Sequence, residues 1–198
     1  MLFRSARRAA GLAEESVTLF REVGDRRGTA TSLRLLGEAL LHEGDHDRAW
    51  RCAEESLALF RELGDRWAIG YAVRLLAAIA LARKDYDAAY RWYTDSMAMH
   101  REHGDRLGIV KCLEGLTYVM AGTGQYERGA RLLGAADRLR KEIGAPLTHV
   151  EAPVVERCIA RLRGALGDVR FEVLLEEGRG MNDEQVRVEV GDTLQANA

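Results

Sequence analysis

The chain has 198 residues, of which 47% are hydrophobic and 30% are charged, a balance typical of a globular protein rather than a disordered one. A formal net charge of −2 at pH 7 excludes an overall basic field that would attract nucleic acid. The apolar runs, such as residues 75–82, are far shorter than the roughly 20 residues of a membrane span, and the first ten residues lack the apolar segment of a signal peptide.

Apolar residues recur at steps of three and four along most of the chain, and polar breaks divide this pattern into helices. Before Gly144 the pattern predicts seven helices, at residues 5–23, 27–43, 46–63, 67–83, 86–103, 107–122 and 126–143. After Gly144 the pattern changes, because Pro146 interrupts it.

Three further helices are expected in the C-terminal part. Pro153 fits the start of a helix over residues 153–166, and the next is expected over 168–177, ending at Gly178. Asn182 and Gln185 have the spacing of a capping box for a last short helix. The tail at 191–198 is expected to be flexible.

The tripeptide Gly-Asp-Arg occurs three times at 40-residue intervals, beginning at Gly24, Gly64 and Gly104. The segments 14–26 and 54–66, which end with the first two copies, agree at 10 of 13 positions. Glycine can adopt the left-handed conformation that ends a helix, and aspartate can cap the helix that follows. Each 40-residue unit is therefore predicted to be two helices and two turns, with Gly-Asp-Arg as a structural boundary.

Small residues recur at 40-residue intervals where helices must approach closely. They include Gly37, Ala77 and Thr117, then Ala49, Ala89 and Gly129, and then Ser16, Ser56, Ser96 and Ala136. This pattern resembles the tetratricopeptide repeat, whose usual unit is about 34 residues. The resemblance implies an all-α, tetratricopeptide-like right-handed solenoid of antiparallel helix pairs with a 40-residue period.

The expected domain organisation follows from this repeat. Residues 1–144 form an array of about three and a half units, and 145–190 form C-terminal capping helices. The array opens on the second helix of a pair, so we expect either a piece of a longer protein or a truncated reading frame.

The C-terminal part carries a second resemblance. The sequences ARLLGAADRLRKEIGAPL (130–147) and ALGDVRFEVLLEEGRGMNDEQV (165–186) resemble the C-terminal end of bacterial signal-transduction ATPases with LuxR-type or AfsR/SARP-type DNA-binding domains. Leu175 departs from the family, which usually has tryptophan there. The resemblance implies the sensor or scaffold arm of a transcriptional regulator. The chain has neither a G-x-x-x-x-G-K-[ST] phosphate loop nor a basic recognition helix, so we expect no ATPase activity and no direct nucleic acid binding.

One string matches a catalytic pattern. The residues from His42 to His46 read H-E-x-x-H, which binds zinc when both histidines lie on one continuous helix. The repeat register instead places Gly44 and Asp45 on a turn, and no convincing third ligand follows. We therefore expect no metal, cofactor or catalytic residue, with a zinc hydrolase kept as an alternative.

Three other sets of side chains invite a functional interpretation. His100 and His103 could form a pH-sensitive pair, but we expect partly exposed substitutions. The tryptophans, which are Trp50, Trp67 and Trp92, are expected to pack in the core or between repeats. The three cysteines are Cys52, Cys112 and Cys158. Because they are odd in number and far apart, we expect reduced, buried thiols in a cytoplasmic protein.

In tetratricopeptide arrays the first helix of each pair lines a binding groove. If this chain has the same geometry, side chains of successive units line the groove in three rows. The rows are Thr31, Tyr71 and Lys111, then Arg34, Arg74 and Glu114, then Glu38, Ala78 and Tyr118. Two arginines in one row could clamp a carboxylate or an acidic peptide, the alternative being ordinary solvated charge. We therefore expect a non-catalytic module for a protein, a peptide or a small effector, which could also self-associate. A free-standing adaptor unrelated to transcription is the main alternative.

Overall fold

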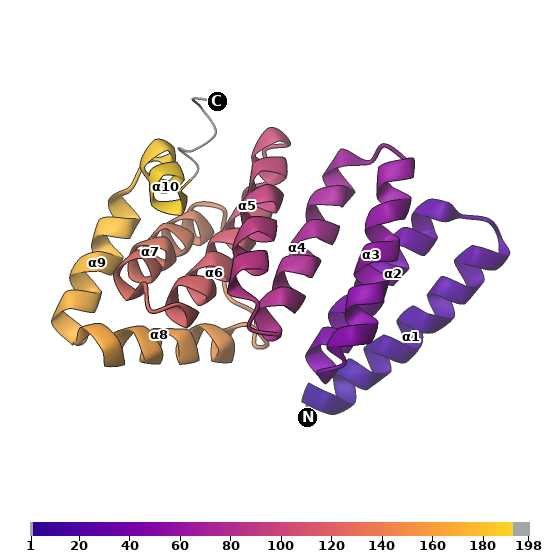
Figure 1. The fold of residues 1–198 in the computed structure, drawn as a ribbon, viewed down its shortest axis with the longest axis horizontal. Coiled ribbons are helices and arrows are strands. Elements are labelled where there is room, and N and C mark those ends of the chain that lie inside the picture. Colours follow the sequence, from indigo (N-terminus) through magenta and orange to yellow (C-terminus); the bar gives the residue numbers. More distant parts are fainter. Residues whose placement is uncertain (1, 192–198) are drawn as a thin grey trace. The chain divides into compact units, whose positions relative to one another are not determined.

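The computed structural model describes residues 2–191, with side chains from residue 6 onward. These residues form ten helices and no strand: α1 (Leu2–Glu22), α2 (Arg26–Glu43), α3 (His46–Glu62), α4 (Arg66–Ala82), α5 (Tyr86–Glu102), α6 (Arg106–Gly122), α7 (Tyr126–Glu142), α8 (Ala152–Leu166), α9 (Asp168–Gly180) and α10 (Asp183–Val190) (Figure 1). The predicted all-α, tetratricopeptide-like fold is confirmed. The expected flexible tail, apart from residue 191, lies outside the described residues.

The turns between successive pairs are built as the repeat predicts. Gly24, Gly64 and Gly104 have φ angles of 72°, 67° and 66°, which lie in the left-handed region. The aspartate after each glycine accepts a hydrogen bond of 2.9 to 3.0 Å from the amide three residues later and so caps the next helix. The interpretation of Gly-Asp-Arg as a helix boundary is confirmed.

The turns within pairs use the same backbone conformation. Gly44 and Gly124 have φ angles of 85° and 80°, and Lys84 takes this position in the middle pair with a φ of 62°. Because a side chain is strained in this region, lysine is the less favourable residue there.

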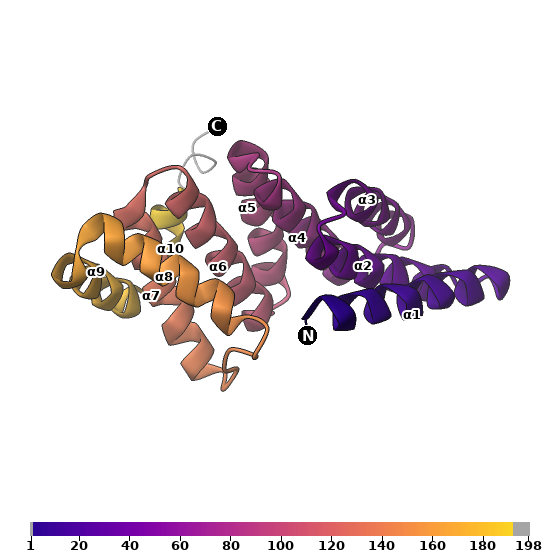
Figure 2. The same ribbon diagram turned by 90° about the horizontal axis from the view of Figure 1, so that it is seen from below.

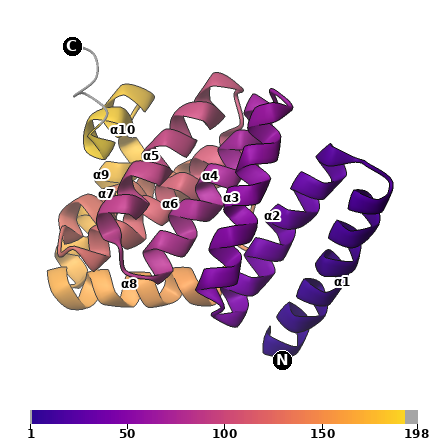
Figure 3. The same cartoon turned by 45° about the vertical axis from the view of Figure 1, so that its right-hand side comes forward.

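The chain divides into two compact units, one ending at Met99 and the other beginning at His100, within α5. In the first unit α1, α2, α3 and α4 lie side by side, each antiparallel to the next (Figures 1 and 3). The hydroxyl of Ser56 donates to Ala30 O at 2.7 Å, and 40 residues later Ser96 donates to Gly70 O at 2.8 Å. These small residues bring the second helix of each pair against the first, as the repeat predicts.

One helix of the first unit keeps an apolar stripe in solvent. Leu12 and Leu19 on α1, and Val23 directly after it, are 56%, 60% and 75% exposed. Self-association through this end of the array stays a prediction.

In the second unit, α6 and α7 form the last helix pair, and α8 runs across both while α9 packs along α7 (Figures 1 and 2). A Cβ added to Gly178 would lie 2.0 Å from Arg131 O, and one added to Gly134 would lie 2.1 Å from Leu175 O. The α7–α9 crossing is therefore a backbone-to-backbone contact that only glycine permits.

The predicted end of α9 at Gly178 is wrong, because the helix continues to Gly180. Gly178 does not end α9 but allows α9 to pack closely against α7. The capping box of α10 is confirmed, since Asn182 and Gln185 exchange side-chain-to-backbone hydrogen bonds of 2.8 and 2.9 Å.

Within residues 2–191, no helix has both the length and the apolar character that crossing a membrane requires.

Candidate binding site on α2 and α4

Two arginines on the first helices of the first two complete pairs share one carboxylate. Arg34 Nη1 donates to Glu38 Oε1 at 2.7 Å, one turn along α2. Arg74 on α4 donates from Nη2 to the same oxygen at 3.3 Å. The three side chains are 18% to 32% exposed, so they are fixed in place yet open to solvent. The cluster carries two positive charges against one negative charge.

An aromatic ring lies between these arginines. The guanidinium carbons of Arg34 and Arg74 are each 5.7 Å from the ring centroid of Tyr71, within cation–π range. Because Tyr71 precedes Arg74 by three residues, both side chains lie on one face of α4. Tyr71 therefore contacts both guanidinium groups.

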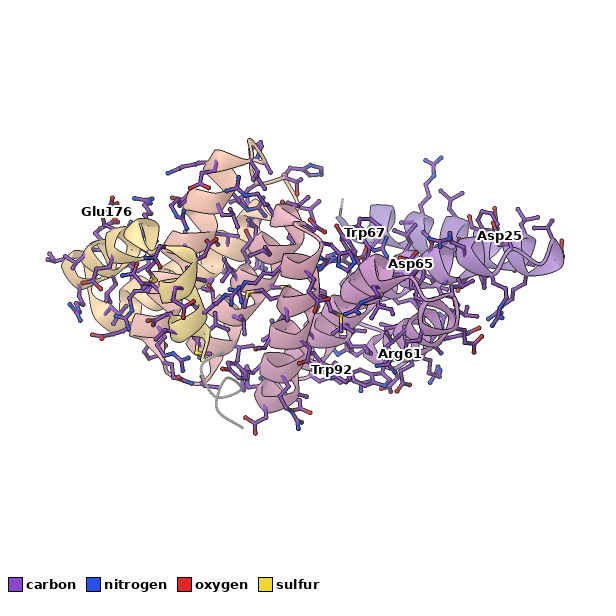
Figure 4. All side chains as sticks on the ribbon, turned by 90° about the horizontal axis from the view of Figure 1, so that it is seen from above. Asp25, Arg61, Asp65, Trp67, Trp92 and Glu176 are labelled. Carbon is purple, nitrogen blue, oxygen red and sulfur yellow. The ribbon has the colours of Figure 1, made fainter. Side chains whose placement is uncertain are left out.

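Trp67 extends this surface. It lies at the start of α4, close to Asp65 (Figure 4), and its ring centroid is 4.7 Å from that of Tyr71. The expectation that Trp67 packs in the core or between repeats is wrong, since 52% of it is exposed. Trp50 and Trp92 do pack against the core of the first unit. We call Arg34, Glu38, Trp67, Tyr71 and Arg74 the α2–α4 surface.

Arg74 also has hydrogen-bonding capacity that Glu38 does not use. Its Nε atom is buried and has no hydrogen-bond partner among the residues that the structure describes. Thr31, the remaining candidate on α2, is exposed and donates to Arg27 O at 3.0 Å. Four of the six residues predicted for the groove in the first unit therefore form one cluster, and Thr31 and Ala78 lie outside it.

The candidates in the second unit make different contacts. Glu114 accepts hydrogen bonds of 2.6 and 3.0 Å from Arg140, and Arg140 also donates to Ala145 O at 2.9 Å. Lys111 pairs with Glu151, in the turn before α8. Tyr118 packs against the core. These side chains connect α6 and α7 to the segment leading into α8.

The H-E-x-x-H string lies across a turn, as the repeat register predicts. Gly44 is left-handed and Asp45 caps α3 through Arg48 N, so His42 lies in the last turn of α2 and His46 begins α3. A continuous helix, which this zinc pattern requires, is interrupted here. Across residues 2–191, no group of three or more His, Cys, Asp or Glu side chains is arranged to hold a metal ion.

The expectation that His100 is partly exposed is wrong. Only 1% of the residue is exposed, and its Nδ1 lies 3.0 Å from Asp105 Oδ2, beneath Gly108. His103 is exposed, as expected. The two histidines therefore have different environments.

An array of stacked antiparallel helix pairs is characteristic of helical-repeat proteins. Residues 6–62 match the family model described as Tetratricopeptide repeat. Such repeats usually mediate protein–protein interaction.

Among solved structures, the chain is similar to a de novo designed helical repeat protein, with 20% identity, a TM-score of 0.43, and coverage of 99% of this chain and 94% of that one. The search of curated proteins gave no match. The regulator resemblance stays a prediction.

Proposed function

We propose that the chain is a non-catalytic interaction module whose α2–α4 surface binds an acidic segment of a partner protein. The observation that carries this proposal is the sharing of one Glu38 oxygen by Arg34 and Arg74. Each guanidinium has five N–H donors and gives one hydrogen bond to Glu38, so the terminal amino groups keep further donors for a ligand. An incoming carboxylate would also meet a net positive charge.

The geometry favours binding at low entropic cost. Glu38 and Tyr71 already hold both guanidinium groups, so a partner would not have to order two flexible side chains. Tryptophan, tyrosine and arginine are also the residues that contribute most to binding energy at protein interfaces. The exposed Trp67 beside Tyr71 supplies an apolar contact next to the cations. The expected ligand therefore combines carboxylates with an apolar residue.

The biological context rests on the C-terminal resemblance. We infer that the chain is the sensor or scaffold arm of a bacterial transcriptional regulator and acts in the cytoplasm. A free-standing adaptor would use the same surface, and an ATPase or DNA-binding domain encoded beside or within the same gene favours the regulator. Stoichiometric zinc in the purified protein, lost on His42→Ala substitution, would instead favour the hydrolase alternative.

The direct test uses fluorescein-labelled peptides in which Asp and Glu alternate with apolar residues. Fluorescence anisotropy should show saturable binding that weakens by at least about tenfold in the Arg34→Ala/Arg74→Ala variant, since hydrogen bonds to charged groups contribute roughly 1.5–3 kcal/mol each. The matched control is Arg51→Ala/Arg61→Ala on α3, where both residues are exposed (Arg61 is labelled in Figure 4). Unchanged binding in the first variant, or equal binding of the same peptides with Lys replacing Asp and Glu, refutes the proposal.

A further inference from the structure

The second unit contains a cavity that the repeat pattern does not predict. It has a volume of about 730 Å³ and lies among α7, α8, α9 and the turn at residues 144–147. Pockets of roughly 300–1,000 Å³ are the usual size for small-molecule ligands. Much of its wall is apolar and includes Leu133, Ala136, Val155, Ile159, Phe171 and Leu175.

One side of the cavity carries two cations that share a carboxylate oxygen. Lys141 Nζ and Arg179 Nε donate to Asp137 Oδ2 at 2.9 and 2.7 Å. Burial alone would raise the pKa of Asp137, but these two hydrogen bonds outweigh burial and lower the pKa, so the carboxylate is charged at neutral pH. Lys141 is 67% exposed and Arg179 is 34% exposed, so an anion can reach both. This pair therefore keeps a surplus positive charge at the cavity.

The other charged side chains that line the cavity each have a partner of opposite charge. Arg140 is bound to Glu114, as described above. Arg163 pairs with Glu172, and its guanidinium carbon lies 5.0 Å from the ring centroid of Phe171. The lining side chains alone therefore sum to one positive charge, at Lys141 and Arg179, and Arg179 has a further counter-charge outside the lining. Glu176 lies outside the lining and pairs with Arg179 at 3.0 Å, on the exposed side of α9 (Figure 4).

We propose that this cavity binds a small amphiphilic anion, whose apolar body packs against Leu133, Val155 and Ile159 and whose anionic head accepts hydrogen bonds from the donors of Lys141 and Arg179 that Asp137 does not use. An apolar wall contributes affinity through buried area, while a single charged edge fixes the orientation of the ligand. A cationic head would be repelled by Lys141 and Arg179, and a neutral head would form no charge-assisted pair with them. The site lies wholly in the second unit and does not depend on the α2–α4 surface.

Calorimetry with dodecanoate, compared with dodecyltrimethylammonium and dodecanol, tests the proposal on the full chain. Dodecanoate should bind with one-to-one stoichiometry and a negative heat-capacity change, which marks burial of apolar surface. The cationic and neutral analogues should bind at least about tenfold more weakly, because they lack a charge-assisted hydrogen bond to Lys141 or Arg179.

Two variants locate the site. Lys141→Glu should weaken dodecanoate binding by at least about tenfold. Ile159→Trp should weaken all three ligands by filling the cavity. The control Arg157→Glu reverses an exposed charge on α8 outside the lining and should leave the affinity unchanged.

Because Lys141 is exposed, its substitution should leave the circular dichroism spectrum unchanged, so lost binding cannot be attributed to unfolding. Absence of saturable dodecanoate binding, equal affinity for anionic and cationic heads, or equal weakening by Lys141→Glu and Arg157→Glu would each overturn the proposal.

Discussion

Arg140 occupies the repeat position that Phe60 fills two units earlier, and both residues are buried, with 7% and 2% of their surfaces exposed. An aromatic ring can be buried there without a partner, whereas a guanidinium requires one. Glu114 supplies it through two hydrogen bonds. The buried charge pair therefore stands where the first unit has apolar packing.

We expect Glu114→Ala to destabilise the second unit by up to about 3–5 kcal/mol, because it removes both charge-assisted hydrogen bonds of the buried Arg140 and leaves it only the more distant carboxylate of Glu151, at 3.6 Å. The double variant Glu114→Ala/Arg140→Met should recover most of this loss, since it removes both charges. Urea unfolding monitored by circular dichroism measures both effects. A double variant no more stable than the single one would contradict the interpretation of Arg140 as a buried cation replacing an apolar residue.

This position also shows how far the sequence can predict the structure. The 40-residue register, read from Gly24, Gly64 and Gly104, predicts every helix boundary between residues 26 and 142 within one residue. The same register places His100 and Arg140 at the buried position of Phe60. The polar character of His100 favours exposure, whereas its repeat position favours burial, and in the structure the repeat position prevails.

The binding surfaces are less predictable from the sequence. The register aligns Arg34 with Arg74, but it does not reveal that Glu38, four residues after Arg34, connects them. Exposure of Trp67 depends on which helix covers the start of α4. The cavity depends on non-repeating helices whose crossing is set by Gly134 and Gly178, and neither glycine belongs to the 40-residue pattern.

The α7–α9 crossing gives a second prediction. Gly178→Ala should destabilise the second unit by about 1–3 kcal/mol or more, because the added methyl group would lie 2.0 Å from Arg131 O and force the two helices apart. The matched control is Gly164→Ala on α8, where no atom lies within 4 Å of an added Cβ. That control should stabilise the helix by up to about 1 kcal/mol. Thermal unfolding of the two variants should therefore shift in opposite directions.

The cysteines are expected to differ in reactivity. Burial raises the pKa of Cys158 to about 11 and also raises the pKa of the half-buried Cys52. Cys112 is completely buried. Iodoacetamide at pH 8 should therefore modify Cys52 first, and Cys158 and Cys112 only in urea, because the thiolate is the reactive form. Rapid modification of Cys158 in the native protein, detected by peptide mass spectrometry, would contradict its burial.

The raised pKa of Cys158 also predicts a dependence of stability on pH. The folded state favours the neutral thiol, whereas in the unfolded chain the thiol ionises near its ordinary pKa of 9.0. This contribution is fully present below pH 9 and is lost as the pH rises towards 11, because the unfolded state loses its proton first. Cys158→Ala should therefore show a smaller loss of stability between pH 9 and 11 than the parent protein.

The last prediction concerns the carboxylate that the two arginines share. Glu38→Gln removes the only acidic group of the α2–α4 surface but keeps a side-chain oxygen that can accept from Arg34 and Arg74. Acidic peptides should then bind more tightly, by about threefold to tenfold at low salt, because the surface gains one unit of positive charge. The gain should shrink at 0.5 M salt, since screening weakens exposed charges. If Glu38→Gln instead weakens binding as much as Arg34→Ala/Arg74→Ala does, Glu38 acts mainly by positioning the arginines, and that role outweighs its competition with the ligand.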